Sequence, residues 1–213
     1  NKLFLKEDKI LIGVSGGADS VALLTLLHSL NYNICFAHCN FNLRGKESDE
    51  DELFVKRLSE IFNIECYIKS FDVKSFSKKN KISTQMAARE LRYKWFEEIR
   101  KLTNSKYIAV AHHQDDDIET FFINLIRGTG IRGFLGMKSK KNSIVRPLLG
   151  FSRKDIEFYL KGVNQEYRID SSNTDVKYLR NNIRHHLLPL LKDMNPSFDK
   201  TVINEIEYLN DVF

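Results

Sequence analysis

Short apolar runs alternate along the chain with longer stretches in which apolar residues recur every three or four positions. The runs lie at residues 10–14, 34–38, 66–70 and 107–111, with a fifth candidate at 144–148. Runs of this length are typical of buried strands, and the stretches between them are typical of amphipathic helices. Because strand and helix alternate four times, the sequence predicts an α/β fold in which helices cover both faces of a parallel sheet.

Four helices are expected between these strands. They are predicted to start near Ser20 and near Ser48, to span about residues 83–103, and to start around Asp115. Ser48 is followed three positions later by Asp51, which suggests a weak capping box for the second helix. Right-handed crossovers then favour a doubly wound parallel sheet with the strand order 3-2-1-4-5.

Length and composition limit the organisation of the chain. A chain of 213 residues, 42% of them apolar, supports one principal core, which we expect at residues 1–195. Residues 196–213 are expected to form a helical C-terminal extension, the start of a linker to further domains. No apolar run approaches the roughly 20 residues of a membrane span, the N-terminus lacks a signal-peptide pattern, and three cysteines do not make a disulfide framework. The sequence therefore predicts a cytoplasmic protein with no membrane partner.

The segment Ser15-Gly16-Gly17-Ala18-Asp19-Ser20 stands between the first predicted strand and the helix that follows it. Two glycines allow a tight turn that exposes backbone N–H groups, and the helix N-terminus adds partial positive charge. Both features favour an anion, and two serine hydroxyls add donors. The segment lacks the third glycine of a dinucleotide fingerprint and the lysine of a Walker loop. A purely structural glycine turn is the simpler alternative, but the six-residue pattern favours a phosphate-binding loop.

A second polar cluster, His112-His113-Gln114-Asp115-Asp116-Asp117-Ile118-Glu119-Thr120, follows the fourth predicted strand and opens a helix. Asp116 and Glu119, three positions apart, project from one face of that helix. Such like charges repel unless a metal ion, a lysine ammonium or an arginine lies between them. Helix capping would explain Asp115 and Asp116 without a ligand, and zinc is a minor option because further ligands at suitable spacing are missing. The cluster predicts a cation-binding site.

Topology is expected to bring these two segments together. In an open α/β sheet, ligands bind beyond the carboxyl ends of the strands, where the winding direction reverses. In the order 3-2-1-4-5 the first and fourth strands are neighbours, so the loop at residues 15–20 and the cluster at 112–120 would share one crevice. Asp19 and Asp116 on opposite sides of the sheet would contradict this prediction.

The net charge of +5 is unevenly placed, because Lys and Arg outnumber Asp and Glu mainly between residues 127 and 192. A basic half favours a polyanionic partner, since each neutralised phosphate releases counterions. A solvated lysine-rich surface would explain the charge equally well.

The loop at residues 15–20 resembles the SGGxDS pyrophosphate loop of the N-type ATP pyrophosphatases, the PP-loop superfamily. Six further segments stand in the order typical of one family in it, the tRNA(Ile)-lysidine synthetases: HCNFNLR from His38, AARELRY from Ala87, RGTGIRG from Arg127, VRPLL from Val145, DSSN from Asp170 and RNNIR from Arg180. The resemblance covers about residues 9–196 and implies an adenine nucleotide alpha hydrolase-like fold. One departure is Phe41, where many members have a second histidine, so position 41 is given no role.

The resemblance implies that residues 1–195 form an ATP-pyrophosphatase catalytic domain. ATP would adenylate the 2-oxygen of the wobble cytidine in the CAU anticodon of an isoleucine tRNA, and free L-lysine would then attack carbon 2. AMP and pyrophosphate would leave. The partners implied are ATP, Mg²⁺, L-lysine and this tRNA, and a homodimer is left open.

The resemblance also implies roles for single residues. The ATP-binding residues would be Ser15, Gly16, Gly17, Ala18, Asp19 and Ser20, with Asp19 as the magnesium ligand. Lysine would bind Asp116 and Glu119. The candidate catalytic residues are Asp19, His112, Asp116, Arg92 and Arg184, with His112 as a proton acceptor. The candidate tRNA contacts are Arg127, Arg132, Arg146, Arg180 and Arg184. An ordinary charged helix face would also explain Arg92, and Arg180 and Arg184 suit phosphate contact as well as catalysis.

Two other functions are weighed against this one. A tRNA thiolation enzyme of the same superfamily would need a reactive cysteine or a cluster-binding CxxC. Cys35 and Cys66 are expected to be buried strand residues, and only Cys39 reaches a loop. A non-catalytic tRNA-binding module would keep the fold without binding ATP, which the intact loop at residues 15–20 disfavours.

Overall fold

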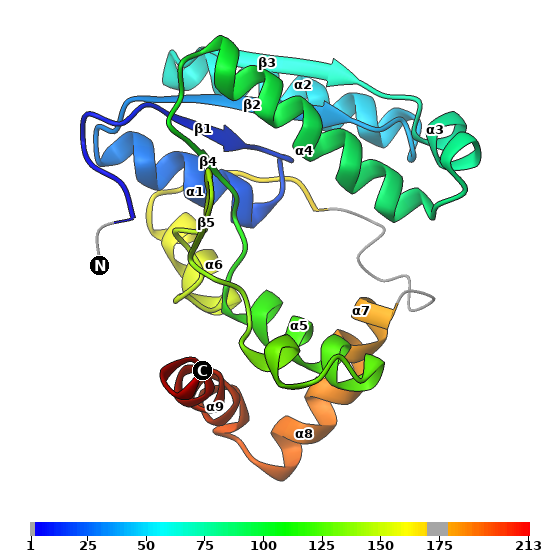
Figure 1. Cartoon of the computed structure of the whole chain (residues 1–213). Helices are drawn as coiled ribbons and strands as arrows, with labels where there is room; N and C mark the ends of the chain where they lie inside the picture. Colours follow the sequence, from blue (N-terminus) through cyan, green and yellow to red (C-terminus); the bar gives the residue numbers. More distant parts are fainter. Residues whose placement is uncertain (1–2, 170–178) are drawn as a thin grey trace.

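Residues 3–169 and 179–213 are described by the computed structural model of the chain (Figure 1). The DSSN segment at residues 170–173, which contributed to the family resemblance, lies outside the described residues. Within the described ranges, no helix is both long enough and apolar enough to cross a membrane.

Six strands form one sheet in the order β3-β2-β1-β4-β6-β5. Their bounds are β1 (Ile10–Gly13), β2 (Ile34–Asn40), β3 (Cys66–Ser70), β4 (Tyr107–Ala109), β5 (Lys140–Lys141) and β6 (Ile144–Val145). Every neighbouring pair is parallel except β5 and β6. The predicted order of five parallel strands is confirmed, with β6 as the fifth. The sheet also has an antiparallel edge strand that the sequence did not predict, because two consecutive lysines carry no apolar alternation.

Helices connect the strands and extend the fold beyond the sheet. They are α1 (Ala18–Ser29), α2 (Lys46–Phe62), α3 (Val73–Asn80), α4 (Thr84–Leu102), α5 (Gln114–Arg127), α6 (Arg153–Gly162), α7 (Leu179–Asn182), α8 (Leu188–Met194) and α9 (Phe198–Val212). A 3₁₀ turn, η1 (Ile131–Phe134), follows α5, and a π-helical turn, η3 (Ile183–Leu187), separates α7 from α8. The four predicted helices are α1, α2, α4 and α5.

The first residues of α4 and α2 can be compared with the helix starts predicted from the sequence. Ser83 is the N-cap of α4, and its hydroxyl accepts a hydrogen bond from the backbone N–H of Met86 at 3.2 Å, as expected for a helix that begins there. The predicted capping box of the second helix is wrong. Because α2 already begins at Lys46, Ser48 lies inside the helix, and Asp51 instead pairs with Arg44 at 2.6 Å.

The two faces of the sheet are covered by different helices (Figure 1). Ile10 and Ile12 point into a core shared with α1, α2 and α6, and Leu11 points into a second core on the opposite face, against α4. This alternation follows from the two-residue period of a strand. Buried apolar side chains pack against both faces of the strands, and the carboxyl ends of β1, β2 and β4 lie at one edge of the sheet.

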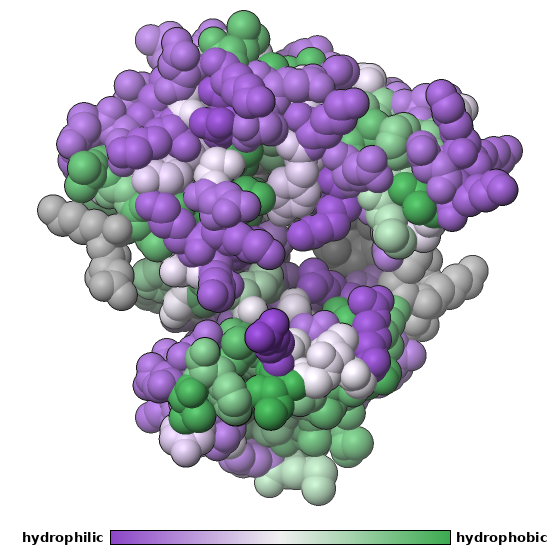
Figure 2. Space-filling view, in the orientation of Figure 1, coloured by the Kyte–Doolittle hydropathy of each residue, from purple (hydrophilic) through white to green (hydrophobic). Residues whose placement is uncertain are grey.

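A helical layer lies below the sheet in Figure 1 and contains α5, α8 and α9. Its own small core joins these helices through Ile118, Ile183, Leu188, Val202 and Ile206. Apolar side chains also reach the surface of this layer, among them Leu125, Leu190 and Met194, and the molecule is hollowed between this layer and the sheet (Figure 2). The predicted helical C-terminal extension is therefore present as α9. The boundary at residue 195 stays a prediction.

Candidate functional site

The loop at residues 15–20 adopts a conformation that requires glycine. Gly16 has φ +97°, a region that side chains other than glycine rarely enter. The Ser20 hydroxyl organises the turn: it accepts from the backbone N–H groups of Ser15 at 3.1 Å and Gly16 at 3.2 Å, and lies 3.0 Å from the Gly17 carbonyl. These two N–H groups are thus used inside the turn. Helix α1 follows directly from Gly17, and the backbone N–H groups of its first turn stand at a positive helix end, which favours an anion.

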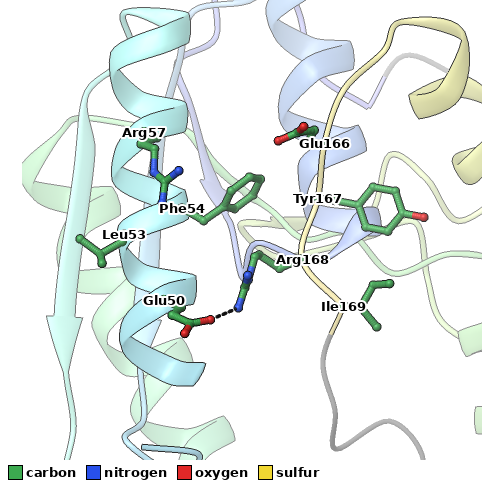
Figure 3. Close-up of a pocket in the computed structure, with 8 residues that line it drawn as sticks. All are labelled: Glu50, Leu53, Phe54, Arg57, Glu166, Tyr167, Arg168 and Ile169. Atoms are coloured by element: carbon green, nitrogen blue, oxygen red, sulfur yellow. Dashed lines mark hydrogen bonds and ion pairs between the residues drawn. The ribbon is translucent and has the colours of Figure 1, made fainter. Parts of the chain in front are cut away.

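Residues 166–169 hold this loop from outside. The backbone N–H of Arg168 donates to the Gly16 carbonyl at 2.9 Å, and its guanidinium contacts Glu50 at 2.6 Å and Asp51 at 3.1 Å (Figure 3). Between α2 and this segment lies a cavity of about 500 Å³. Its lining contains no residue predicted for the site. Arg168 thus ties the loop to α2 rather than offering its charge to the loop.

His113, at the start of α5, joins the two predicted segments. Its Nε2 lies 3.7 Å from Asp19 Oδ1 and 3.5 Å from Asp116 Oδ2, and its Nδ1 lies 3.3 Å from Asp115 Oδ2. The side chain is only 4% exposed. Asp116 also accepts from the backbone N–H of His113 at 3.1 Å, so it caps the helix as well. The structure therefore brings Asp19 and Asp116 together on one side of the sheet.

Burial and mutual contacts shift the pKa values of the side chains around His113. Burial alone would lower the pKa of His113, but the carboxylates of Asp115, Asp116 and Asp19 outweigh it and raise that pKa. Burial also opposes ionisation of Asp115, yet its contacts with His113 and the backbone N–H of Arg153 lower its pKa to about 2. Burial raises the pKa of Asp19. The raised pKa means that His113 holds a second ring proton more readily than a free imidazole, and a protonated ring offsets part of the negative charge of the three aspartates.

Two arginines occupy the carboxylate pair Asp116 and Glu119. Arg184 contacts both Glu119 oxygens, with Nε at 2.5 Å and Nη2 at 3.1 Å, and reaches Asp116 at 3.8 Å. Arg180 adds contacts of 3.4 Å to Glu119 and 3.8 Å to Asp116. The Glu119 side chain is 1% exposed. The sequence predicted a cation between these two carboxylates, and in this conformation that cation is arginine.

A cavity of about 280 Å³ opens beside the loop at the carboxyl ends of β1, β2 and β4. Its lining includes Ser15, Asp19, Ser20, Phe41, Arg92 and His112. The Arg92 guanidinium lies 5.2 Å from the centre of the Phe41 ring, a cation–π distance. Three of the predicted catalytic residues, Asp19, Arg92 and His112, therefore share one cavity.

His112 is neutral in this environment. Burial lowers its pKa to about 4, and its Nδ1 accepts a hydrogen bond from Arg146 Nε at 3.1 Å. Arg146 also donates to the Lys138 carbonyl at 2.7 Å and is 8% exposed. Of the predicted tRNA contacts, Arg127 and Arg132 are exposed, Arg146 is buried, and Arg180 and Arg184 are paired with acids.

Cys39 and Cys66 are thiols rather than thiolates. Burial raises the pKa of Cys39, which lines the 280 Å³ cavity, to about 12, and it raises the pKa of Cys66 to about 12 as well. Cys35 is 1% exposed. A thiol that does not ionise near neutral pH is a poor nucleophile.

The donor set at Asp19 suits magnesium with phosphates. Mg²⁺ typically takes one or two carboxylates, with substrate phosphates and waters completing its octahedron. The Asp19 carboxylate is 28% exposed and follows directly on the loop N–H groups, so a metal there would meet phosphate oxygens. Within residues 3–169 and 179–213, no three His, Cys, Asp or Glu side chains form a metal-binding group by themselves.

Sequence reasoning missed Arg153 and left His113 without a role. Arg153 Nη1 contacts both Asp19 oxygens, at 2.8 and 2.9 Å, across a separation of 134 residues. The capping box formed by Ser152 and Asp155 would have located the start of α6, but not its neighbour in space. His113 was visible in the polar cluster, and only the fold shows that it faces Asp19.

Comparisons of the sequence with known proteins show its family. The model of the PP-loop domain matches residues 1–191. A tRNA(Ile)-lysidine synthase of Bacteroides thetaiotaomicron is 50% identical over 210 residues, which cover 99% of this chain and 49% of that protein. A second, from Thermosipho africanus, is 42% identical over 96% of this chain and 49% of that protein. The chain spans about half the length of the curated relatives it matches.

Solved structures show the same fold in proteins of distant sequence. The U34-tRNA thiolase NcsA of Methanococcus maripaludis, solved with its [4Fe-4S] cluster, matches with TM-score 0.77 and 19% identity over 98% of this chain and 74% of that one. An NH3-dependent NAD synthetase of Campylobacter jejuni matches with TM-score 0.56 and 20% identity over 96% of this chain and 86% of that one. At these identities the likeness shows the fold alone.

Proposed function

Since the chain belongs to the PP-loop domain family, we propose that it is the ATP-dependent catalytic domain of a tRNA(Ile)-lysidine synthase, which ligates L-lysine to carbon 2 of the wobble cytidine in a CAU anticodon. One observation carries the proposal: His113 contacts Asp19 of the loop and Asp116 of the carboxylate pair within 3.7 Å. A group that handles phosphate and a group that handles an amine thus stand next to each other. Similarity to lysidine synthases along almost the whole chain supports the choice of substrate.

In the first step, the loop holds the triphosphate of ATP. The backbone N–H groups of the first turn of α1 and the hydroxyls of Ser15 and Ser20 would bind its phosphates, and charge grows on phosphoryl oxygens as the α-phosphorus is attacked. Mg²⁺ at Asp19 would neutralise part of that charge. The 2-oxygen of cytidine forms a bond to the α-phosphorus, and pyrophosphate leaves.

In the second step, the amine of lysine attacks carbon 2 and AMP leaves. Asp116 and Glu119 would bind the amine, which requires Arg180 or Arg184 to yield a carboxylate oxygen, because both now contact the pair. We assign Arg92 and the released Arg184 to the charge of the leaving AMP phosphate. His112 can accept a proton at Nδ1 only after Arg146 has moved, because that hydrogen bond occupies the lone pair.

The surface around η1 is proposed to contact tRNA. Arg127 and Arg132 are exposed near the end of α5, where they can meet phosphates. Arg146 is not expected to do so from its buried position. An enzyme that modifies tRNA is expected to work in the cytoplasm.

The thiolation alternative is disfavoured by the cysteines. Sulfur transfer needs a thiolate or a cluster ligand, whereas burial raises the pKa values of Cys39 and Cys66 to about 12. Replacing all three cysteines by alanine or serine is expected to leave AMP formation intact. Loss of AMP formation in a variant that still folds would favour thiolation.

The experiment that tests the function is direct. The intact protein is incubated with ATP, labelled lysine and a panel of purified tRNAs, and label is counted in each tRNA. We expect label only in an isoleucine tRNA with a CAU anticodon, together with stoichiometric AMP. ATP cleavage without lysine incorporation would overturn the proposed second substrate, and no ATP binding would leave a non-catalytic tRNA-binding module.

A further inference from the structure

Arg153 is the first residue of α6, and three separate contacts fix its position. Its backbone N–H donates to Asp115 Oδ2 at 2.8 Å, and its Nε donates to Glu157 at 2.7 Å. Its Nη1 lies 2.8 and 2.9 Å from the two oxygens of Asp19. Helix α6 packs beside α1, so both ends of this ion pair stand on rigid elements.

The guanidinium lies between two cavities. One, of about 170 Å³, is lined by Ser15, Gly17, Ala18, Asp19, Arg153, Tyr167, Arg168 and Ile169. The other, of about 300 Å³, contains Arg153 together with His113, Glu119 and Arg184. The smaller cavity is bounded by the phosphate loop itself. Because Arg168 is turned toward Glu50 and Asp51, Arg153 is the guanidinium in this lining whose charge is directed at the loop.

The present partner of Arg153 conflicts with the proposed role of Asp19. Nη1 contacts both carboxylate oxygens of Asp19, and a divalent cation bound to the same oxygens would repel the guanidinium. A triphosphate in the loop offers several anionic oxygens nearby, and a planar guanidinium binds such oxygens well. Glu157 contacts Nε on the other side of the group, so we expect Nη1 and Nη2 to exchange partners while Nε stays with Glu157.

We propose that Arg153 is a ligand of the β- and γ-phosphates of ATP, and of the pyrophosphate formed from them, and that Asp19 holds it in place until the nucleotide binds. This inference rests on the proposed use of ATP and adds a phosphate-binding residue to it. In the bound state Arg153 contacts phosphate oxygens directly, and Asp19 is released to the metal.

Binding of inorganic pyrophosphate by titration calorimetry, on the intact protein without lysine or tRNA, tests this contact. Arg153→Met is expected to bind pyrophosphate and ATP about tenfold to a hundredfold more weakly, the range for a charge-assisted hydrogen bond. Binding of adenosine, which has no phosphate, should be unchanged. Arg153→Lys keeps the positive charge but not the planar guanidinium. Its affinity for pyrophosphate should therefore lie between that of the unaltered protein and that of Arg153→Met.

Lys154→Met is the matched control. It removes the same charge from the neighbouring, exposed position of α6 and should bind pyrophosphate like the unaltered protein. A loss of binding in Lys154→Met equal to that in Arg153→Met would mean that net charge alone is measured, which would overturn the inference.

A second comparison separates a phosphate ligand from a residue that merely orients Asp19. In an Asp19→Asn background the ion pair is already gone. Adding Arg153→Met should still weaken pyrophosphate binding at least tenfold if the guanidinium meets phosphate. No further loss in the double variant would show that Arg153 acts only through Asp19. In either case, the labelled-lysine experiment on the unaltered protein reports separately on the proposed ligase function.

Discussion

The proposed lysine site contains two carboxylates, and both are largely buried. Glu119 is 1% exposed and Asp116 is 13% exposed, and both contact Arg184. Burial raises the pKa of Glu119. The contacts with Arg184 and Arg180 act in the opposite direction and favour the charged carboxylate, so an incoming ammonium would compete with them for the same oxygens.

Neutralising either carboxylate should affect lysine more than ATP. Asp116→Asn and Glu119→Gln each remove one negative charge from the amine site, and we expect the KM for lysine to rise by about tenfold or more while the KM for ATP changes little. Steady-state kinetics with each substrate varied in turn measures both. Equal loss for ATP and lysine would indicate damage to the structure and would contradict the assignment.

Asp117 is not part of the site, but it anchors the chain that follows η1. It is 6% exposed, and its Oδ1 accepts from the backbone N–H of Met137 at 2.5 Å. Gly136, with φ +64°, leaves the space that the carboxylate occupies, since a Cβ there would lie 2.7 Å from Asp117 Oδ1. Burial raises the pKa of Asp117 to about 6.

This raised pKa makes stability fall with pH. The folded state holds the Asp117 proton up to about pH 6, whereas the unfolded state releases it near pH 3.8, so this group lowers the free energy of unfolding as pH rises from about 4 to 6. Asp117→Asn should therefore gain up to about 3 kcal/mol over the unaltered protein at pH 7, and little at pH 4. Denaturant unfolding at both pH values measures the difference. If the two proteins differed in free energy of unfolding by the same amount at pH 4 and pH 7, the raised pKa of Asp117 would be contradicted.

Asp155→Asn should differ from the unaltered protein in stability with the opposite dependence on pH. Its contact with Ser152 lowers the pKa of Asp155, so the stability that it contributes is present above its unfolded pKa and is lost as pH falls.

At the scale of elements, β1 and α4 pack closely together beside the site. A Cβ on Gly13 would lie 2.5 Å from Phe96 Cε2, and Phe96 is 3% exposed. The ring also lines the 280 Å³ cavity. Because Gly13 has no side chain, the Phe96 ring can pack against β1 and line the cavity at the same time.

Gly13→Ala should destabilise the protein by about 1–3 kcal/mol, because a buried ring must move to admit one methyl group. Gly162→Ala, at the end of α6 where nothing lies within 4 Å of the added atom, should be neutral or slightly stabilising. Thermal unfolding of the two variants measures this. A smaller loss at Gly13 than at Gly162 would contradict the close packing.

At the scale of the whole molecule, residues far apart in sequence tie the loop to its surroundings. Arg168 joins the loop at Gly16 to Glu50 and Asp51 on α2, and Arg153 joins the loop to α6. Asp51 is shared, because Arg44 also contacts it at 2.6 Å. The loop is thus held by two arginines whose segments are separate along the chain.

Arg168→Met should loosen the loop without unfolding the molecule, since Asp51 keeps Arg44 as its partner. We expect faster hydrogen exchange at the backbone amides of residues 15–20 and weaker pyrophosphate binding. Arg57→Met is the control, because Arg57 lines the same 500 Å³ cavity as Arg168 (Figure 3). It should change neither the hydrogen exchange of residues 15–20 nor pyrophosphate binding. Unchanged exchange in Arg168→Met would show that the backbone hydrogen bond to Gly16 is sufficient by itself.

The sequence by itself determined the strand order, the loop at Gly16 and the meeting of Asp19 with Asp116, because these depend on local periodicity and on the topology of parallel strands. It could not place α6, the edge strand β5 or Arg153, since a helix start gives no sign of what it will face 134 residues away. Only the tertiary structure decided that arginines occupy the carboxylate pair and that His112 is neutral. Both results depend on burial and on distances between side chains, which no spacing along the chain encodes.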